Sequence, residues 1–300
     1  MALSPDDPGG EQIPQWCSCG RMAKLVVLGA PNRDQVKAEY ERLRPVLMTN
    51  SEIVAEDFCF QHDFTDCDSD LVVVIGGDGS ILQSARQMGM HQRPVLGVNC
   101  GKLGFLAALS PEDFLDAWPK VCVGDFAVVD HLMIQVEILR GDQIVASQIG
   151  LNEAAVLGGP PYTILDIDLY ADGELATQYR CDGLIIATPV GSTAHNLSAG
   201  GPILRRQLQA ITISPISPHT LTYRPLVDSA DTVLELTVAM PQPTTSIVVD
   251  GRVLETLQAG DRVRISRALV AFQMLSVPGQ NDYRTLRDKL GWGGTLNLRR

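Results

Sequence analysis

The chain has 300 residues, of which 45% are hydrophobic and 20% charged, and its formal net charge is −11. This length and composition are typical of an ordinary globular protein with two domains or one large domain. The negative charge argues against general nucleic-acid binding, which needs a basic surface, and no apolar run approaches the length of a bilayer span. We therefore expect neither a nucleic-acid partner nor a membrane partner.

The first 22 residues are acidic and rich in proline and glycine, and they lack the basic and apolar regions of a secretory signal. We expect residues 1–22 to form a flexible leader. The seven cysteines are scattered and odd in number, which indicates reduced thiols and a cytoplasmic location rather than a disulfide framework. Cys17 and Cys19 lack the spacing of a zinc site and no second pair follows nearby, so we expect no zinc there.

Residues 23–124 alternate between strand and helix patterns, which predicts an α/β domain with a mostly parallel sheet covered by helices. Ser110 is a good N-cap, because Pro111 and two acidic residues follow it in the first turn. The expected elements are strand Lys24–Leu28, a helix from residue 31 through Leu43, strand Ile53–Phe60, strand Leu71–Ile75, a helix after Asp78, strand Pro94–Val98 and a helix after Ser110.

A glycine-rich turn joins the strand Leu71–Ile75 to the next helix and contains Gly77, Asp78, Gly79 and Ser80. Glycines at such a junction leave backbone N–H groups free near the positive end of the helix, where phosphate is favoured. A carboxylate in an anion site is useful only if it acts on a proton or a metal ion, so the turn indicates phosphoryl transfer. The alternative is a tight turn with glycines at positive φ, and the tetrapeptide by itself favours neither.

A second glycine-rich turn, Asn99–Leu106, follows the strand Pro94–Val98. The segment Gly97–Lys102 resembles a P-loop but is one residue shorter and has Leu103 where Ser or Thr is needed. The first turn lacks the third glycine of the dinucleotide fingerprint. Both turns are expected at the carboxyl ends of parallel strands, where ligands bind in such sheets. Because the chain is acidic, phosphate needs local cations: a divalent ion, or some of Arg86, Lys102, Arg180, Arg205, Arg206 and Arg224.

Beyond residue 124 the pattern changes to short strands separated by Gly-Asp, Asp-Gly and Pro turns, which predicts an all-β domain over residues 125–275. The segment from Asn281 predicts an amphipathic helix, and we expect residues 276–300 to pack back on the first domain. The expected strands are Phe126–Leu139, Ile144–Leu151, Thr163–Tyr170, Leu184–Thr188, Ala210–Ile213, Val233–Val238, Ser246–Val249 and Arg262–Ile265; the helix carries Tyr283, Leu286, Leu290 and Trp292.

The all-β part carries a second group of polar residues, namely Asn152-Glu153 and the segment Thr188–Pro202, which is rich in hydroxyls and glycines. Small N–H and O–H donors suit close approach of phosphate or ribose oxygens. A serine hydrolase using Ser192 and His195 is the alternative, but the Gly-x-Ser-x-Gly elbow is absent. We expect a ligand-binding loop.

Together, Gly76–Ser80, Asn152-Glu153 and Thr188–Pro202 resemble the three signature motifs of NAD kinases. The match runs from about Lys24 to Trp292, nearly the whole chain, and the order and spacing of the motifs make it specific. Further segments similar to blocks of this family are Gly97–Leu106, Pro218–Leu221, Arg224–Leu226 and Leu286–Trp292.

The resemblance implies transfer of the γ-phosphoryl group of ATP to the 2′-hydroxyl of the adenosine ribose of NAD, giving NADP. It implies Asp78 as general base, and Mg²⁺ or another divalent cation with the ATP. Arg180 matches a basic residue of family members that prefer ATP to polyphosphate, and a homodimer or homotetramer built through the β-domain is implied. Phosphate would be bound by Gly77, Gly79 and Ser80 with Arg86 as a cation, and NAD by Asn152, Glu153, Asp182, Thr193, Ala194, His195, Ser198 and Asp250.

His195 and Val190 stand where the family usually has Tyr and Thr. An imidazole still stacks on adenine, with less area and with a charge that can titrate near neutral pH. Two alternatives are other kinases. Phosphofructokinases have a second phosphate loop after the first strand, and the segment at that place in this chain, Gly29–Arg33, does not fit such a loop. Lipid kinases lack the Gly200–Pro202 block that this chain has. A non-catalytic NAD(P)-binding sensor is the alternative of another class, and the presence of Asp78 argues against it.

Overall fold

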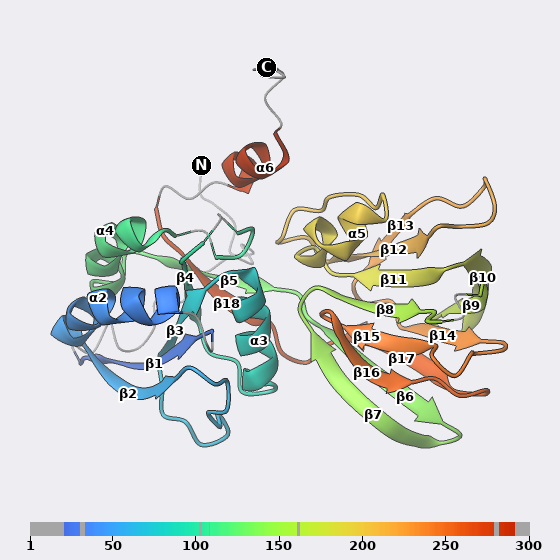
Figure 1. Cartoon of the computed structure of the whole chain (residues 1–300), viewed down its shortest axis with the longest axis horizontal. Coiled ribbons are helices and arrows are strands. Elements are labelled where there is room, and N and C mark those ends of the chain that lie inside the picture. The colour runs from blue at the N-terminus through green and yellow to red at the C-terminus, as the bar shows by residue number, and fades with distance from the viewer. Residues whose placement is uncertain are drawn as a thin grey trace, which may run out of the picture. The chain divides into compact units, whose positions relative to one another are not determined.

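The computed structural model describes residues 21–30, 34–101, 104–107, 109–160, 163–278 and 282–291. The expectations for the leader up to residue 20, for Cys17 and Cys19, for Lys102 and for Trp292 therefore lie outside the described residues. The chain divides into two compact units (Figure 1), the first extending to Val129 and resuming at Gln273, the second spanning Asp130–Phe272. No helix in the described part of the chain is long and apolar enough to cross a membrane.

A six-stranded sheet forms the centre of the first unit. The pairs β1–β2, β1–β3, β3–β4 and β4–β18 are parallel, which confirms the mostly parallel sheet. Strand β18 comes from the far end of the chain and places Met274 opposite Val95. In spatial order the strands are β2 (Ser51–Asp57), β1 (Ala23–Gly29), β3 (Leu71–Gly76), β4 (Val95–Asn99), β18 (Phe272–Ser276) and β5 (Ala127–His131).

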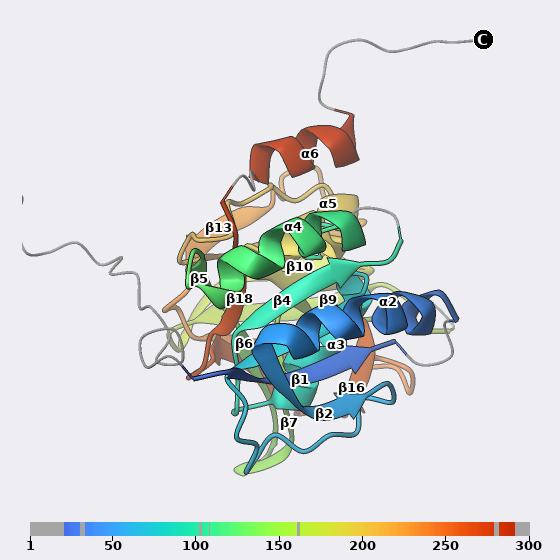
Figure 2. The same ribbon diagram turned by 90° about the vertical axis from the view of Figure 1, so that its left-hand side faces the viewer.

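Helices cover both faces of this sheet (Figure 2): α2 (Asp34–Asn50) and α4 (Pro111–Cys122) on one, α3 (Asp78–Met88) on the other. The strand residues divide between the faces with the period of two expected for strands. Leu96 and Val98 pack in one cluster with the buried side chains of α2 and α4, whereas a Cβ on Gly97 would lie 2.9 Å from Ile81 of α3. Apolar burial on both faces explains the nearly continuous hydrophobic strands.

The start of α4 confirms Ser110 as N-cap. Its hydroxyl accepts the Asp113 N–H at 3.0 Å, and the Asp113 carboxylate accepts the Ser110 N–H at 3.3 Å. This reciprocal capping box satisfies two N–H groups that lack partners within the helix. Helix α2 continues to Asn50 although it contains Pro45, so it is longer than the expected end at Leu43.

The second unit consists of two antiparallel six-stranded sheets that share one apolar core. Alternate residues of each strand point into that core, as Val136 and Ile138 do from one sheet and Leu184 and Ile186 from the other. One sheet has the order β10 (Glu174–Cys181), β9 (Leu165–Ala171), β14 (Leu234–Val238), β17 (Arg262–Arg267), β6 (Ile134–Arg140), β7 (Gln143–Gly150). The other has β13 (Leu226–Ser229), β12 (Ala210–Ile216), β11 (Gly183–Ala187), β8 (Glu153–Leu157), β15 (Ser246–Val249), β16 (Arg252–Thr256).

The all-β expectation is confirmed, but several elements differ. The expected strand Phe126–Leu139 is two strands, β5 and β6, which belong to different sheets. Strands β8, β10, β13, β16 and β18 were not predicted. Of these, β10, β13 and β16 are edge strands with exposed residues, whereas β8 and β18 are mostly buried and lie inside their sheets. The segment after β11 is not an open loop: it contains a 3₁₀ turn, η1 (Gly191–Thr193), and a short helix, α5 (His195–Ser198).

The predicted C-terminal helix is α6 (Asp282–Leu290), which belongs to the first unit. The Lys289 ammonium lies 5.0 Å from the centre of the Phe105 ring, a cation–π contact within this unit. The contact places α6 over the turn that follows β4.

Candidate active site

The turn after β3 is built so that it leaves space around two glycines. Gly77 is the N-cap of α3, with φ −109°, and Asp78 is the first residue of the helix. Neither Gly77 nor Gly79 has a positive φ, and a Cβ added to either would meet no described atom within 4 Å. Packing and backbone conformation therefore do not require glycine here. The structure favours an approach site for a ligand over a simple tight turn.

The Asp78 carboxylate is held by the second glycine-rich turn. Its Oδ2 accepts the Phe105 N–H at 2.7 Å, and its Oδ1 accepts the N–H groups of Leu106 and Ala107 at 2.9 and 3.0 Å. The two turns meet because β3 and β4 are parallel neighbours, with Gly76 opposite Asn99. Both therefore leave the sheet at the carboxyl ends of strands, as expected.

Asn99 shapes the turn that supplies these N–H groups. Its Nδ2 donates to the carbonyl of Ala107 at 3.0 Å, its Oδ1 accepts the Gly101 N–H at 2.8 Å, and its own N–H donates to the carbonyl of Leu109 at 2.7 Å. The side chain is 5% exposed. Asn99 thus folds the chain back, so that three consecutive N–H groups face one carboxylate.

Two other predicted phosphate ligands take different positions. Ser80 is 8% exposed, and a Cβ on Gly76 would lie 2.2 Å from its Oγ, so its side chain packs against the end of β3. Arg86 lies in the last turn of α3 and donates to Gln83 Oε1 at 2.8 Å. Its backbone lies eight positions after Asp78 in the helix, about 12 Å along the axis. A role of Arg86 in binding phosphate stays a prediction.

In the second unit, Asp250 holds the Asn152-Glu153 segment. It lies in a two-residue Asp-Gly turn between β15 and β16, with φ 47°, and Gly251 follows at φ 75°. Its Oδ2 accepts the Leu151 N–H at 2.8 Å, and its Oδ1 accepts those of Asn152 and Glu153 at 2.7 and 3.1 Å. A carboxylate thus again anchors three consecutive N–H groups.

Glu153 is buried beside this anchor. It is 6% exposed, and its Oε2 is buried with no hydrogen-bond partner among the described residues. Burial, and to a smaller extent the nearby Asp250 carboxylate, raise its pKa to about 7, while a hydrogen bond from the His195 N–H acts in the opposite direction. A buried acceptor without a partner is suited to a donor from a ligand, such as a sugar hydroxyl.

The segment Thr188–Pro202 is held by buried hydroxyls and one amide. Thr188 donates through Oγ1 to the carbonyl of Leu151 at 2.6 Å and accepts the Gly191 N–H at 3.1 Å. Ser192 is 0% exposed and donates to the carbonyl of Pro189 at 2.6 Å. A fully buried hydroxyl that donates to the backbone is not a nucleophile poised on a histidine. The structure therefore excludes the serine-hydrolase alternative.

Asn196 is a residue that sequence reasoning missed. It is 0% exposed, and its Nδ2 donates to the carbonyls of Ser192 and Pro202 at 3.1 and 3.0 Å. Its Oδ1 accepts the hydroxyls of Thr212 and Ser214 at 3.0 and 2.7 Å. All four hydrogen-bonding positions of the amide are used. The signal in the sequence that could have indicated Asn196 is an Asn among small residues just before Gly200-Gly201.

The predicted NAD ligands of this segment lie around the Asn196 core. Thr193 donates to the carbonyl of Val190 at 3.2 Å, the Ala194 N–H donates to that of Gly191 at 2.9 Å, and His195 and Ser198 are exposed at the two ends of α5. A Cβ on Gly191 would lie 2.0 Å from the Asn152 carbonyl oxygen. The structure thus brings Asn152, Glu153, Asp250 and the start of α5 together.

Arg180 and Asp182 do not lie in that cluster. In the β8–β11 pair Glu153 faces Ala187, whereas Gly183, next to Asp182, faces Leu157 at the other end. Five residues along the strand separate Asp182 from that position, roughly 16 Å. Within this chain Asp182 therefore does not lie beside Glu153, and its part in NAD binding stays a prediction. His219 instead contacts both Arg180 and Asp182. Its backbone N–H donates to the Arg180 carbonyl at 2.9 Å, and its ring lies 3.5 Å from the Asp182 carboxylate.

The remaining candidate cations come from separate segments of the chain. Arg224 donates to the carbonyls of Leu221 and Tyr223, both at 2.7 Å, so its guanidinium caps its own loop. Arg205 and Arg206 lie between α5 and β12. Lys102 is outside the described residues.

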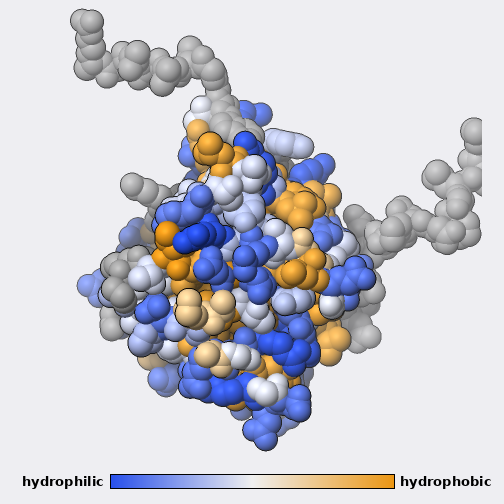
Figure 3. All heavy atoms as spheres, turned by 90° about the vertical axis from the view of Figure 1, so that its right-hand side faces the viewer, coloured by the Kyte–Doolittle hydropathy of each residue, from blue (hydrophilic) through white to orange (hydrophobic). Residues whose placement is uncertain are grey.

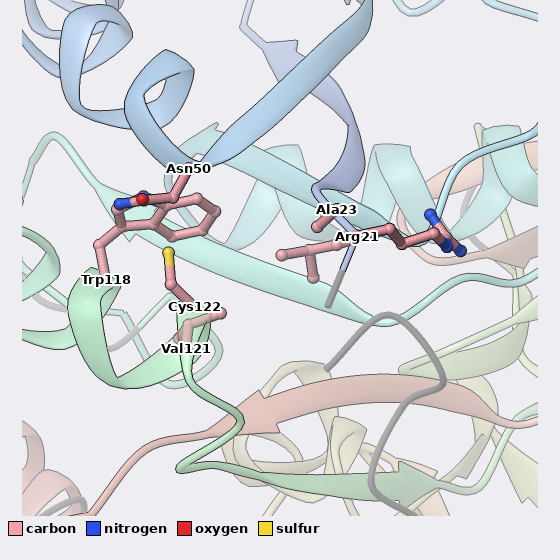
Figure 4. A pocket seen from close by; sticks show the side chains of 7 residues that line it. Arg21, Ala23, Asn50, Trp118, Val121 and Cys122 are labelled. Atoms are coloured by element: carbon pink, nitrogen blue, oxygen red, sulfur yellow. The ribbon is translucent and has the colours of Figure 1, made fainter. Parts of the chain in front are cut away.

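A small cavity in the first unit lies at the wrong edge of the sheet for a ligand site (Figure 4). Its volume of 20 Å³ is about that of one water molecule. It is lined by Ala23 and Leu71, which begin β1 and β3, and by Trp118, whose buried Nε1 has no partner among the described residues. These are the amino ends of the strands, opposite the edge that carries Asp78. We assign the cavity no role in function.

Known proteins resemble both halves of the chain. Residues 32–126 match the family model of the ATP-NAD kinase N-terminal domain, and residues 151–277 match that of the ATP-NAD kinase C-terminal domain. An NAD kinase of Rhodopirellula baltica is 70% identical over 290 residues, which cover 97% of this chain and 93% of that protein. An NAD kinase of Cellvibrio japonicus is 40% identical over 228 residues, 76% of either chain.

Solved structures agree with these sequence matches. An NAD kinase from Archaeoglobus fulgidus in complex with ATP superposes with a TM-score of 0.69 at 27% identity, covering 89% of this chain and 97% of that one. Yeast NADH kinase complexed with NADH has the same fold, with a TM-score of 0.82 at 21% identity and coverage of 99% and 95%. These matches remove the phosphofructokinase and lipid-kinase alternatives. The chain therefore belongs to the NAD kinase family.

Proposed function

We propose that Asp78 is the general base of this ATP-dependent NAD kinase and takes the proton of the 2′-hydroxyl on the adenosine ribose of NAD. The hydroxyl oxygen bonds to the γ-phosphorus of ATP as the bond to ADP breaks, which gives NADP. A sugar hydroxyl is a weak nucleophile, so the reaction needs a fixed carboxylate and an in-line phosphate. The proposal rests on one observation: three N–H groups fix Asp78, while open space surrounds the adjacent glycines.

The phosphates of ATP would bind at the start of α3. The Gly77–Gly79 backbone offers N–H groups at the positive end of the helix, and the absent side chains of Gly77 and Gly79 allow close approach. Mg²⁺ would enter as part of the MgATP substrate and neutralise the triphosphate. In the described ranges no group of three or more His, Cys, Asp or Glu side chains is arranged to hold a metal ion, so phosphate oxygens would supply most of its ligands.

The adenosine part of NAD would bind where Asn152, Glu153 and the start of α5 come together. Glu153 Oε2 is the buried acceptor that a ribose hydroxyl would satisfy. Asp250 would act by holding the Asn152-Glu153 backbone. Thr193, Ala194, His195 and Ser198 would line the same site, with the exposed His195 ring available to stack on adenine. Asp182 and Arg180 would contact more distant parts of the substrates.

Replacing the base tests this assignment. Asp78→Asn keeps the shape of the side chain and two of its three accepted hydrogen bonds, but it cannot take a proton. We expect NADP formation from ATP, Mg²⁺ and NAD, read with an NADP-specific dehydrogenase, to fall by about 10²- to 10⁴-fold, while the Kd for NAD measured by calorimetry is unchanged. Asp116→Asn, an exposed change on α4, is the control and should keep the rate. A wild-type rate in Asp78→Asn contradicts the proposal.

We further propose ATP rather than polyphosphate as donor, since Arg180 is a mostly exposed basic side chain 3.8 Å from Asp166. The same assay with polyphosphate in place of ATP should yield little NADP. Arg180→Gln should raise the yield from polyphosphate relative to ATP; an unchanged ratio contradicts the role of Arg180.

A homodimer or homotetramer is the proposed assembly. Apolar side chains are exposed on edge strands of the second unit, namely Ile144 and Val145 of β7, Val253 of β16 and Leu226 and Val227 of β13. Strands β7 and β16 are in contact. Figure 3 shows the hydrophobic groups of one face interspersed among hydrophilic ones. Light scattering after size exclusion should give a molar mass that is a multiple of 32.5 kDa. The double substitution Val253→Lys and Ile144→Lys should reduce this mass.

A cytoplasmic location is supported by the thiols. Cys59, Cys67, Cys100, Cys122 and Cys181 are all free in the described part of the chain. Reduced cysteines are the rule in a reducing compartment. Cell fractionation of the native protein, with thiol labelling of each fraction, tests the location.

A further inference from the structure

The turn that holds Asp78 contains a glycine with no room for a side chain. A Cβ built on Gly104 would lie 1.9 Å from Asp78 Oδ1, 2.7 Å from its Cγ and 3.0 Å from its Oδ2. The first two distances are far below any real contact of a Cβ atom. Gly104 does not have a positive φ, so the requirement for glycine is steric and not conformational. The neighbour that enforces it is the proposed catalytic carboxylate itself.

The clamp also occupies the two oxygens of Asp78 unequally. A carboxylate has about four lone-pair positions. Oδ1 accepts two N–H groups and Oδ2 accepts one, so the described residues leave one acceptor position, on Oδ2. That position suits a single hydroxyl. A shift of the carboxylate by the width of a methyl group would move this position out of line.

We propose that Gly104 is a positioning residue of the reaction: its missing side chain lets the Phe105–Ala107 N–H groups fix the Asp78 carboxylate with one Oδ2 lone pair directed at the sugar hydroxyl. The inference rests on the proposed role of Asp78 as base. It adds that the orientation of the base is set by a glycine that is 26 residues further along the chain.

Gly101, in the same turn, provides a matched control. A Cβ there would lie 3.7 Å from Asn99 Oδ1, an ordinary van der Waals contact, and its φ is not positive. Gly101→Ala and Gly104→Ala therefore make the same chemical change in the same segment. Only the second displaces Asp78.

The first test separates kcat from KM. In Gly104→Ala we expect kcat to fall by about 100-fold, because misplacement by about 1 Å costs that much, while KM for NAD and for ATP stays within about twofold. Gly101→Ala should keep kcat. A Gly104→Ala enzyme with wild-type kcat overturns the inference, and so does an equal loss in both alanine variants.

The second test uses thermal unfolding and remains informative if Gly104→Ala folds poorly. Removing the carboxylate removes the clash, so Gly104→Ala should lower Tm in the wild-type background and leave it unchanged in an Asp78→Ala background. Hydrogen exchange of the Phe105–Ala107 peptide should be faster in Asp78→Ala and in Gly104→Ala than in Gly101→Ala. Equal Tm losses in both backgrounds overturn the inference.

The two proposals fail differently. If Asp78→Asn keeps its rate, the role of Asp78 as base is wrong whatever Gly104 does. If Asp78→Asn is inactive while Gly104→Ala keeps wild-type kcat, the base assignment stands and the positioning role of Gly104 is wrong.

Discussion

Asp250 holds Asn152 by the backbone: its Oδ1 accepts the Asn152 N–H at 2.7 Å across 98 residues of sequence. The neighbouring N–H groups of Leu151 and Glu153 bind the same carboxylate. Asp78 is arranged in the same way in the first unit, with three consecutive N–H groups from the turn after β4. In both units a carboxylate fixes the backbone of a segment expected to face substrate.

Asp250→Asn should loosen the Asn152-Glu153 segment. An amide side chain has one acceptor oxygen, so it cannot accept on both sides as the carboxylate does, and at least one N–H loses its partner. We expect the free energy of unfolding to fall by about 1–3 kcal/mol and KM for NAD to rise, measured by urea unfolding and initial rates.

Asp172→Asn is the matched control for Asp250→Asn. Asp172 also begins an Asp-Gly turn, with φ 50°, but it holds only the Val233 N–H, at 3.0 Å. An Asn can keep that single bond and tolerates this backbone conformation. Stability and KM should stay close to wild type, and equal effects of the two substitutions would contradict the anchoring role of Asp250.

Glu153 should make stability fall as the pH rises. Burial raises its pKa from 4.5 to about 7, so between these values the folded protein binds more protons at this group than the unfolded chain does. The contribution of Glu153 to stability is therefore lost as the pH rises through this window and is constant above it. Glu153→Gln removes this dependence and should be more stable than wild type at pH 8, by up to about 3 kcal/mol.

The measurement is urea unfolding of both proteins between pH 5 and pH 8. The curves of stability against pH should diverge with increasing pH. Parallel curves would show that Glu153 ionises at its ordinary pKa, which the burial of its side chain argues against.

Asp261 should contribute the opposite pH dependence. It is 4% exposed and accepts two hydrogen bonds from Arg140, at 2.9 and 2.8 Å, which lower its pKa below the ordinary value. Its stabilisation is present at neutral pH and is lost as the pH falls through the lowered pKa. Asp261→Asn should cost about 1.5–3 kcal/mol at pH 7 and progressively less below pH 4.

The exposed pair Arg267–Asp231, at 3.1 Å, is the comparison for Asp261. The Asp231 side chain is 76% exposed, so solvent screens the charge. Asp231→Asn should leave the denaturation midpoint nearly unchanged at either pH. A cost equal to that of Asp261→Asn would contradict the effect of burial.

Asn196→Asp should be strongly destabilising although it is nearly isosteric. The Nδ2 donors toward the Ser192 and Pro202 carbonyls become an acceptor oxygen, and a charge is placed at a site with 0% exposure. We expect a loss of at least about 3 kcal/mol and a higher KM for NAD. Gln207→Glu, the same amide-to-acid change on an exposed residue of the following segment, should be nearly neutral in both assays.

Long-range contacts separate what sequence reasoning could predict from what it missed. The strands Leu71–Ile75 and Ser246–Val249 and the Ser110 N-cap were predicted because their signals lie within a few residues. The edge strands β10 and β13 were missed because exposed strands have no apolar period, and the buried strands β8 and β18 were missed as well. The place of Asp78 at a strand-to-helix turn could be predicted, whereas its partners Phe105–Ala107 depend on β3 and β4 being neighbours.

By itself the sequence determined the local chemistry: two glycine turns at the carboxyl ends of strands, an Asp-Gly turn at Asp250, and a segment rich in small donors after Ala187. Only the tertiary structure decided that Phe105–Ala107 clamp Asp78, that Gly104 makes room for that clamp, and that Asp182 lies at the far end of β11 from Glu153. The physical reason is that residue type and spacing set backbone conformation over a few residues. Hydrogen bonds between residues 27 to 99 positions apart depend instead on the order in which strands pair.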